Sequence, residues 1–455
     1  MEKLPKTWVQ TTLGEVAEWG SGGTPNRAMP KYFSGTIPWI KTGELNNNLI
    51  TKTEEYLSEE ALKNSSAKIF SKGSIAIAMY GATIGKTAIL GIDAATNQAC
   101  AVARAFKGVN NKYLYYYLTS EKQNFIDKGK GGAQPNISQT VIKAHPFPLP
   151  PLNEQERIAN RLYRLFEHID VIQKKMEAIP EFIRQFKQSI LLEAVTGRLT
   201  ENWRKKNKKD SKWKKVKVSD FMFEVKDKTD PRCISETNYI GLEHIEKNGE
   251  LISKGSSKDV RSTKTAFKTG DVLYGKLRPY LNKHIIAPFD GICSTDILVY
   301  RHEQLEYNKF FDYFLGLPDT IAKANSLAKG INLPRITATE INNFNLYMPP
   351  IDECKEIVTQ VEILMGIVSN IEQSYSSLKM NQDALPVTIL NKAFKGELEP
   401  QLEDDGDAAD LLKMIKEQRD GVLKESVRKS SEKLKSNTIK LQKAHKSASY
   451  LSKTK

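Results

Sequence analysis

The sequence predicts an α+β protein in which two mixed, β-rich domains alternate with two long helical regions. An internal repeat is the first reason: at an offset of 199 residues, the stretch from Pro135 aligns without a gap onto the stretch from Pro334. It contains fifteen identities in 66 positions, where average composition gives about four. Both copies also carry apolar residues at helical spacing, and the region ahead of each copy has short β-like runs and frequent glycine. The chain therefore has a pseudo-two-fold internal repeat.

A Pro-Pro pair marks the start of the helical region in each copy, at Pro150-Pro151 and Pro349-Pro350. A helix over 153–179 follows in the first copy and recurs in the second, with apolar residues at alternating spacings of four and three. These residues form the predicted coiled-coil seam: Ile158, Leu162, Leu165, Ile169, Ile172, Met176 and Ile179, with Ile357, Val361, Leu364, Val368, Ile371, Tyr375 and Leu378. Their equal phase predicts that the two stripes pack on each other. The alternative is two amphipathic helices that each cover a separate core.

Beyond Pro180 a second helix is expected through Ile183 and Ala194, closing at Gly197, with the same pattern near Gly396. The two β-rich regions share weaker markers, such as Trp8 with Trp213 and FSKGSIAIAM (70–79) with FKTGDVLYGK (267–276). The predicted domains are a first variable domain (1–151), a helical region with a basic linker (152–207), a second variable domain (208–350), a second helical region (351–400) and a charged C-terminal tail (401–455).

Charge makes a nucleic-acid partner plausible, because 68 Lys and Arg face 54 Asp and Glu, for a net charge of +14. Much of that charge is local, since residues 204–217 carry nine basic side chains and one acidic one. No apolar run is long enough to cross a bilayer, so we expect a cytoplasmic protein. The four cysteines form no CxxC pair, which predicts buried free thiols without a disulfide or a zinc site.

Motifs for catalysis are not found. GATIGKT (81–87) has only three residues between its glycines, one fewer than a phosphate-binding loop requires, and is better explained as a strand-turn-strand. LPPL (149–152) and MPPI (348–351) lack the polar residue of an amino-methyltransferase motif, and Glu224-Val225-Lys226 has no acidic partner upstream. The six histidines fall at no ligand or triad spacing. We therefore expect no catalytic residue, metal or cofactor in this chain.

Polar and basic side chains in the loops of the variable domains are the candidates for DNA contacts, since Arg and Lys can donate to guanine and Asn or Gln can pair with adenine. In the first domain the candidates are Ser21, Gly22, Gly23, Thr24, Lys41, Asn46, Asn47, Lys86, Asn97, Gln98 and Gln134. In the second domain they are Arg261, Lys264, Lys276, Arg278, Tyr280, Lys283, Ser294, Thr295, Asn332 and Arg335.

PLPPLNEQERI (148–158) and its copy YMPPIDECKEI (347–357), with EAVTGRL and KAFKGEL, resemble a known family. GSGGTP and IPWIKTGEL in the first domain add to the likeness. With these motifs, the chain resembles the specificity (S) subunit of type I restriction-modification systems over residues 1 to about 400. Cys354 stands where the family has Gln, present as Gln155 in the first copy.

The resemblance implies that each variable domain is a target recognition domain and that the helices form an antiparallel coiled coil. The chain would then bind a bipartite, asymmetric site on double-stranded DNA and serve DNA methylation and restriction in host defence. Two M (methyltransferase) subunits would supply methylation with S-adenosylmethionine, and R (restriction) subunits would cleave and translocate with ATP and Mg. This chain would be the non-catalytic subunit of that complex.

Two alternatives from other classes are a self-contained nuclease or methyltransferase and a coiled-coil scaffold with two protein-binding domains. The tail stays open as well: it could be an added helix on the M or R subunits, or a basic arm that touches DNA.

Overall fold

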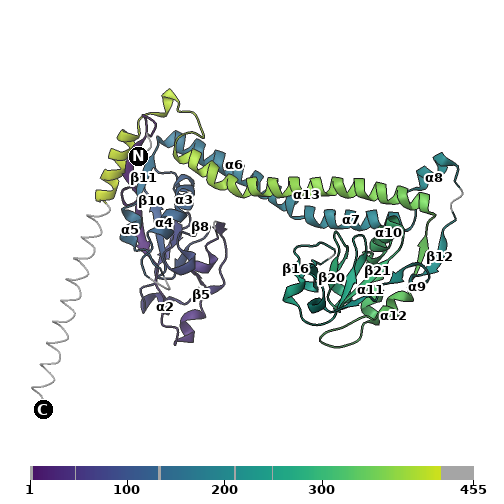
Figure 1. The fold of residues 1–455 in the computed structure, drawn as a ribbon. Coiled ribbons are helices and arrows are strands. Elements are labelled where there is room, and N and C mark those ends of the chain that lie inside the picture. The colour runs from purple at the N-terminus through teal and green to yellow at the C-terminus, as the bar shows by residue number, and fades with distance from the viewer. Residues whose placement is uncertain (1–3, 47, 132–134, 210–211, 248, 422–455) are drawn as a thin grey trace, which may run out of the picture. The chain divides into compact units, whose positions relative to one another are not determined.

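The computed structural model describes residues 4–46, 48–131, 135–209, 212–247 and 249–421. The chain forms two compact units: unit 1 contains residues 1–173 and 380–455, and unit 2 contains residues 174–379. Each unit combines β-sheets with short helices and parts of the long helices, so the predicted α+β class is confirmed (Figure 1). In the part of the chain that is described, no helix is long and apolar enough to cross a membrane.

The strands of unit 1 form three sheets. The central sheet has the order β2-β10-β7-β8-β4 and the second sheet the order β5-β3-β9-β6, while β1 pairs with β11. The strands are β1 (Val9–Thr12), β2 (Ala17–Ser21), β3 (Ile37–Ile40), β4 (Asn48–Ile50), β5 (Glu55–Leu57), β6 (Ile69–Phe70), β7 (Ile75–Ala78), β8 (Thr87–Leu90), β9 (Ala94–Thr96), β10 (Cys100–Ala105) and β11 (Pro146–Leu149). The short helices are α1 (Leu13–Val16), α2 (Glu59–Lys63), α3 (Asn111–Ser120), α4 (Lys122–Asp127) and α5 (Gln139–Lys143).

Unit 2 repeats this plan. Its central sheet has the order β13-β21-β18-β19, its second sheet the order β14-β17-β20-β15-β16, and β12 pairs with β22. The strands are β12 (Lys214–Lys217), β13 (Phe223–Glu224), β14 (Lys228–Thr229), β15 (Asn238–Ile240), β16 (Gly255–Ser256), β17 (Lys264–Phe267), β18 (Val272–Gly275), β19 (His284–Ile286), β20 (Gly291–Cys293), β21 (Ile297–Arg301) and β22 (Asn345–Met348). The short helices are α8 (Glu201–Asn207), α9 (Val218–Phe221), α10 (Leu305–Leu315), α11 (Pro318–Leu327) and α12 (Ala338–Asn342).

Both central sheets are buried on two faces because apolar residues occupy both sides of their inner strands. In unit 1, Ile75 and Ile77 of β7 pack with α3, whereas Ala76 and Ala78 face Ile40 of the second sheet. In unit 2, β18 divides its side chains between the helices and the second sheet in the same way. The matched segments 70–79 and 267–276 thus take the same place in the two units.

The long helices are α6 (Leu152–Glu177), α7 (Ile179–Val195) and α13 (Ile351–Phe394). In the first copy α6 and α7 are separate helices, and Pro180 lies in the first turn of α7. In the second copy the expected break is absent, and α13 continues through Pro386. The physical reason is that Lys379, not a proline, stands at the place equivalent to Pro180.

The predicted pairing of the two seam stripes needs correction. In unit 1, Ile158 and Leu162 of α6 pack in one core with Leu390 and Phe394, at the end of α13. In unit 2, Ile357, Val361 and Val368 of α13 instead share a core with residues of α7, Ile190, Ala194 and Val195. Each stripe therefore packs on the second helical segment of the other copy, which carries an apolar face of its own. In unit 2 the pair is antiparallel, because Lys187 contacts Glu372 (2.8 Å) while Thr200 contacts Glu353 (2.7 Å).

Three residues assigned to the seam are exposed: Ile172, Ile371 and Leu378. The heptad pattern predicts an apolar face but does not say which part of that face the same chain covers. Ile169 is buried, and Leu165, Met176, Ile179, Leu364 and Tyr375 are partly exposed.

A Trp-Glu hydrogen bond joins each domain to the start of a long helix. The indole Nε1 of Trp8 donates to Glu154 (2.9 Å), and that of Trp213 donates to Glu353 (3.1 Å). Next to each indole lies a glycine in the left-handed conformation, Gly396 (φ +76°) beside Trp8 and Gly197 (φ +75°) beside Trp213. These contacts explain why Trp, Glu and Gly recur at matched places in both copies.

Part of the C-terminal tail belongs to unit 1. Residues 408–421 are helical, and Ala408, Leu411, Leu412 and Ile415 join the core of that unit. Arg157 of α6 forms a two-pronged ion pair with Asp405 ahead of this helix (2.7 Å). The segment thus packs on its own first domain, while residues 422–455 lie outside the described part of the chain.

Candidate nucleic-acid interface

In unit 2 the loop between β18 and β19 meets the segment 329–336. The backbone N–H of Arg278 donates to the Pro334 carbonyl (2.7 Å), and that of Ile336 donates to the Lys276 carbonyl (3.1 Å). Arg335 pairs with Asp296 (3.1 Å). Three predicted residues that are far apart in sequence, Lys276, Arg278 and Arg335, thus lie on two adjoining segments.

A polar cavity of about 310 Å³ lies beside these segments. Its lining includes the predicted residues Lys276, Thr295 and Arg335. It also includes Lys226, which the sequence analysis considered only within a rejected nuclease motif, and Lys228, the first residue of β14, which it did not single out. The spacing of two residues between these lysines was the available signal. Glu224 lines the cavity as well and pairs with Lys226 (3.4 Å), and Arg335 pairs with Asp296, so Lys228 and Lys276 are the basic side chains best suited to contact phosphate oxygens there.

Other predicted residues of the second domain brace its loops. Lys264 is 6% exposed, and its ammonium donates to the Ser262 carbonyl (3.0 Å). Lys283 donates to the Leu242 carbonyl (2.7 Å), and the Ser294 hydroxyl accepts from the backbone of Asp296 (3.3 Å). Side chains engaged in this way are poorly placed to contact DNA. Six predicted residues of this domain are exposed: Arg261, Arg278, Tyr280, Thr295, Asn332 and Arg335.

In the first domain, Gly22 and Gly23 are required by close packing. A Cβ on Gly22 would lie 2.2 Å from the Asn97 carbonyl oxygen, and one on Gly23 would lie 2.3 Å from the backbone nitrogen of Ala67. Asn97 is also structural, since its backbone N–H donates to the Ile40 carbonyl (3.0 Å) and its side chain accepts from Cys100 (3.2 Å). The Thr24 hydroxyl donates to Gln98. The GSGGTP motif therefore shapes this loop.

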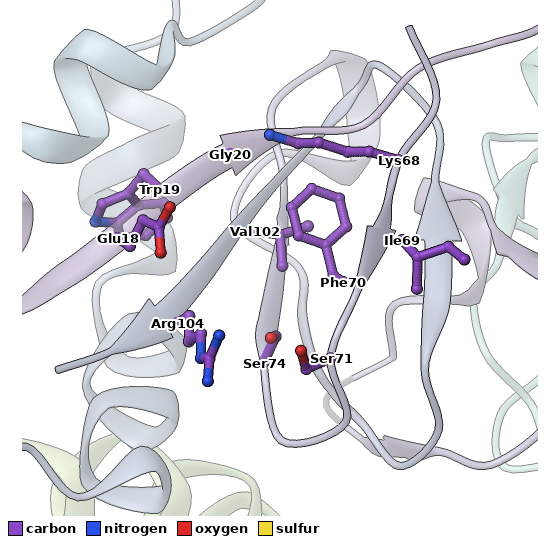
Figure 2. Close-up of a pocket in the computed structure, with 10 residues that line it drawn as sticks. All are labelled: Glu18, Trp19, Gly20, Lys68, Ile69, Phe70, Ser71, Ser74, Val102 and Arg104. Carbon is purple, nitrogen blue, oxygen red and sulfur yellow. The ribbon is translucent and has the colours of Figure 1, made fainter. Parts of the chain in front are cut away.

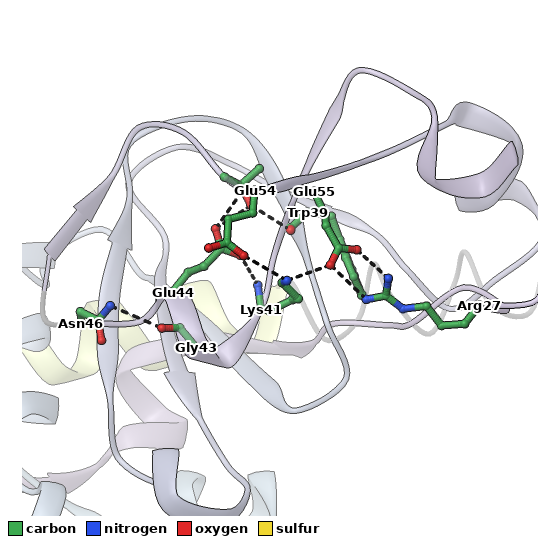
Figure 3. A network of polar contacts seen from close by, with 9 residues as sticks. Arg27, Trp39, Lys41, Gly43, Glu44, Asn46, Glu54 and Glu55 are labelled. Atoms are coloured by element: carbon green, nitrogen blue, oxygen red, sulfur yellow. Dashed lines mark hydrogen bonds and ion pairs between the residues drawn. The ribbon is translucent and has the colours of Figure 1, made fainter. Parts of the chain in front are cut away.

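Lys41 lies in a network with acidic side chains (Figure 3). Its ammonium contacts Glu55 (2.8 Å) and Glu54 (3.2 Å), and Arg27 contacts Glu55 as well (2.7 Å). Hydrogen bonds from Arg27 and then Lys41 lower the pKa of Glu55, and the bond to Glu55 raises the pKa of Lys41. Because two carboxylates neutralise its charge, Lys41 is a weak candidate for a phosphate contact.

The remaining candidates of the first domain lie at loops. Lys86 contacts the side-chain oxygen of Asn46 (3.4 Å), and Ser21 accepts from Gln139 (3.1 Å). Asn47 and Gln134 lie outside the described residues.

A cavity of about 240 Å³ in the first domain displays two basic residues that the sequence reasoning missed, Lys68 and Arg104 (Figure 2). The ammonium of Lys68 lies 5.2 Å from the ring centre of Phe70. Arg104 takes the place in β10 that Arg301 takes in β21, where Arg301 pairs with Asp271 (2.6 Å). The first domain has Ser74 at the position of Asp271, and Arg104 is exposed. The alignment of segments 70–79 and 267–276 places Ser74 opposite Asp271, so the sequence already indicated that Arg104 lacks the aspartate that pairs with Arg301.

No group of three or more His, Cys, Asp or Glu side chains that could hold a metal occurs among the described residues. Burial raises the pKa of the thiols of Cys100, Cys293 and Cys354 to about 12. Cys233 is exposed, which corrects the expectation that every thiol is buried. It lies in the short 3-10 helix Pro231–Cys233, outside both cores.

Comparison with known proteins identifies the class of this chain. Residues 5–181 match the family model described as the type I restriction modification DNA specificity domain. The EcoDI specificity subunit of Escherichia coli is 26% identical and aligns over 92% of this chain and 96% of that protein. The MjaIX specificity subunit of Methanocaldococcus jannaschii is 25% identical over 87% of this chain and 94% of that protein.

Solved structures share the fold. The HsdS subunit from Thermoanaerobacter tengcongensis matches with a TM-score of 0.60 at 17% identity, covering 87% of this chain and 98% of that one. A chain from a study of complex assembly in the type I R-M system matches with a TM-score of 0.63, also at 17% identity, covering 87% of this chain and 100% of that one.

The repeated α+β fold and the matched domain define a DNA specificity protein. More particularly, residues 5–181 carry the type I restriction modification DNA specificity domain, and the chain is similar over most of its length to type I restriction enzyme specificity subunits, in agreement with the expectation of a non-catalytic subunit.

Proposed function

We propose that this chain is the DNA-recognition subunit of a type I restriction-modification complex. It binds a bipartite, asymmetric site through its two domains and directs M and R subunits to that site. The observation that carries the proposal is the repetition of one domain fold with different side chains at matched loops. Gly81 and Thr83 of the first domain stand where the second has Arg278 and Tyr280. Unlike loops on a common fold would read unlike half-sites.

The helices support two similar docking places for M subunits. Ile172 and Ile371 occupy equivalent positions in the repeat, and both are exposed, at 47% and 43%. Exposed apolar side chains at equivalent positions of the two copies suit a partner of which one molecule binds to each copy. In this proposal the M subunits bring S-adenosylmethionine, the R subunits bring ATP and Mg, and this chain supplies no cofactor.

The proposal is tested by mapping modified bases across the genome of a methylation-free host that expresses the M subunits with or without this chain. We expect a split, asymmetric motif that appears only when the chain is present. DNA binding by the complex should also weaken steeply as salt rises, because phosphate contacts release counterions.

If assembled complexes methylate no motif and show no sequence preference in direct DNA binding, the proposal is wrong and the protein-binding scaffold becomes the better explanation. Nuclease or methyltransferase activity of the purified chain alone would favour the self-contained enzyme instead.

A further inference from the structure

Two hairpin loops occupy the same place in the two domains. One joins β7 to β8 in the first domain, and the other joins β18 to β19 in the second. Gly81 in the first loop and Arg278 in the second each donate a backbone hydrogen bond to a proline carbonyl, that of Pro135 (2.8 Å) and that of Pro334 (2.7 Å). The two prolines are equivalent in the internal repeat. Gly81 and Arg278 are therefore counterparts.

Both residues have a left-handed backbone, with φ of +61° at Gly81 and +53° at Arg278. The loops repeat this conformation four residues later, at Gly85 (φ +75°) and Asn282 (φ +49°). Glycine adopts it freely and asparagine tolerates it, but in arginine the Cβ crowds the backbone. Arg278 thus holds a conformation for which its counterpart has the favoured residue.

Neighbouring residues fix this loop. Asn282 is buried and its amide lies 3.2 Å from His284 Nε2, while His284 Nδ1 lies 2.6 Å from the Asp312 carboxylate. Pro279 is buried as well, and the Leu281 N–H donates to the Arg278 carbonyl (2.9 Å). These contacts therefore fix the backbone conformation of Arg278 in the loop.

The side chain of Arg278 is exposed, and its guanidinium has no hydrogen bond or ion pair within the described part of the chain. Other arginines of this domain differ, because Arg232, Arg301 and Arg335 each pair with an aspartate. Arg261 is also exposed, but it lacks the backbone hydrogen bonds that hold Arg278. Near Arg278 lies the cavity lined by Lys226, Lys228, Lys276 and Arg335.

We propose that Arg278 reads a guanine in the half-site bound by the second domain. This inference rests on the proposed function and adds the residue and the base. The guanidinium presents two parallel N–H donors that match O6 and N7 of guanine in the major groove. The lysines around the cavity contact phosphates and so position the loop. Backbone strain at an exposed arginine is retained because glycine could not make the contact.

The test uses the complete complex of this chain with M subunits, in its wild-type form and with Arg278→Gly or Arg278→Lys. With Arg278→Gly, we expect the first half-site and the gap to stay unchanged. Discrimination at one guanine of the second half-site should fall by roughly 10- to 100-fold. The Tm should be unchanged or higher, since glycine relieves the strained backbone. With Arg278→Lys, discrimination should also fall, while the slope of affinity against salt stays close to wild type.

Two control variants calibrate these results. Arg232→Ala removes an exposed arginine of the same domain that pairs with Asp230, and we expect it to leave the motif unchanged. Gly81→Ala places a Cβ in a left-handed position that has no atom within 4 Å of it, so the expected lower Tm reports backbone strain alone.

Each outcome is decisive. If the wild-type complex recognises no motif, the proposed function has failed. If the wild type is specific and Arg278→Gly reads the same motif, Arg278 does not read a base. A lower Tm for Arg278→Gly would make Arg278 a structural residue, and full discrimination by Arg278→Lys would exclude two-pronged reading. Either result overturns the inference.

Discussion

At the scale of single residues, the Trp-Glu junction of unit 2 is a buried polar contact with several partners. Glu353 is 1% exposed and accepts hydrogen bonds from Thr200 (2.7 Å), Trp213 (3.1 Å) and Arg204. A buried carboxylate with three donors is stable only while all partners are present. The first copy is built differently, because the amide of Gln401 donates to Glu154 (2.9 Å) in addition to Trp8, and burial raises the pKa of Glu154.

We therefore expect Glu353→Ala to destabilise unit 2 by about 3 kcal/mol, because it leaves Arg204 and the Trp213 N–H without their acceptor. Urea unfolding followed by fluorescence measures this loss. The matched control is Asp352→Ala, which removes the exposed neighbour that pairs with Lys209 and should change stability little. Equal losses for the two variants would contradict a special role for the junction.

At the scale of elements, the sequence predicts where the long helices start but does not predict how they pair. Leu152 and Ile351 begin the long helices directly after the Pro-Pro pairs, as the sequence predicts. Periodicity identifies an apolar face but not its partner, so the swapped pairing of the stripes could not be read from the heptads. The left-handed backbone of Arg278 was equally invisible, because no residue type marks it there.

If the helices set the gap between the half-sites, adding one heptad will change it. Inserting seven residues after Gln173 alone should alter or abolish recognition of the spacing, since it shifts one helix against its partner. A paired insertion, after Gln173 and after Lys379, lengthens both helices by the same number of residues at the two unit boundaries. It should lengthen the gap by about three base pairs, from a rise of about 1.5 Å per residue and about 3.4 Å per base pair.

Mapping of the methylated motif in each insertion variant measures the gap directly. The base preferences of the two half-sites should be the same in all variants that retain activity. An unchanged gap after the paired insertion would show that the helices do not set the spacing.

At the scale of the whole molecule, both ends of the chain contribute to unit 1. The N–H of Ala408 donates to the Thr7 carbonyl (3.2 Å), and Lys416 contacts Glu15 (3.3 Å). The sequence predicted the repeat and the two β-rich domains, because both leave local patterns. It did not predict where the tail helix packs, since that contact joins residues about 400 positions apart and has no counterpart in the repeat.

Ile415→Ala tests this packing. Ile415 is fully buried in the core of unit 1, so we expect a loss of roughly 2 to 5 kcal/mol in the stability of that unit. Met414→Ala is the control, because this neighbouring side chain is 57% exposed and its removal should cost little. Hydrogen exchange separates the units, and protection should fall in unit 1 only. Equal protection in both variants would place the helix outside the core.

Because unit 1 contains segments from both terminal parts of the chain, it can complete its fold during synthesis only after unit 2 has been made. Unit 2 is one continuous segment of 206 residues (174 through 379), whereas unit 1 needs Leu390, Phe394 and Ile415 to complete its core. At about 5–20 residues per second, synthesis reaches these residues roughly 10 to 50 s after the first domain. During that interval the face that they will cover is open to chaperones, and a stalled or truncated chain exposes it permanently.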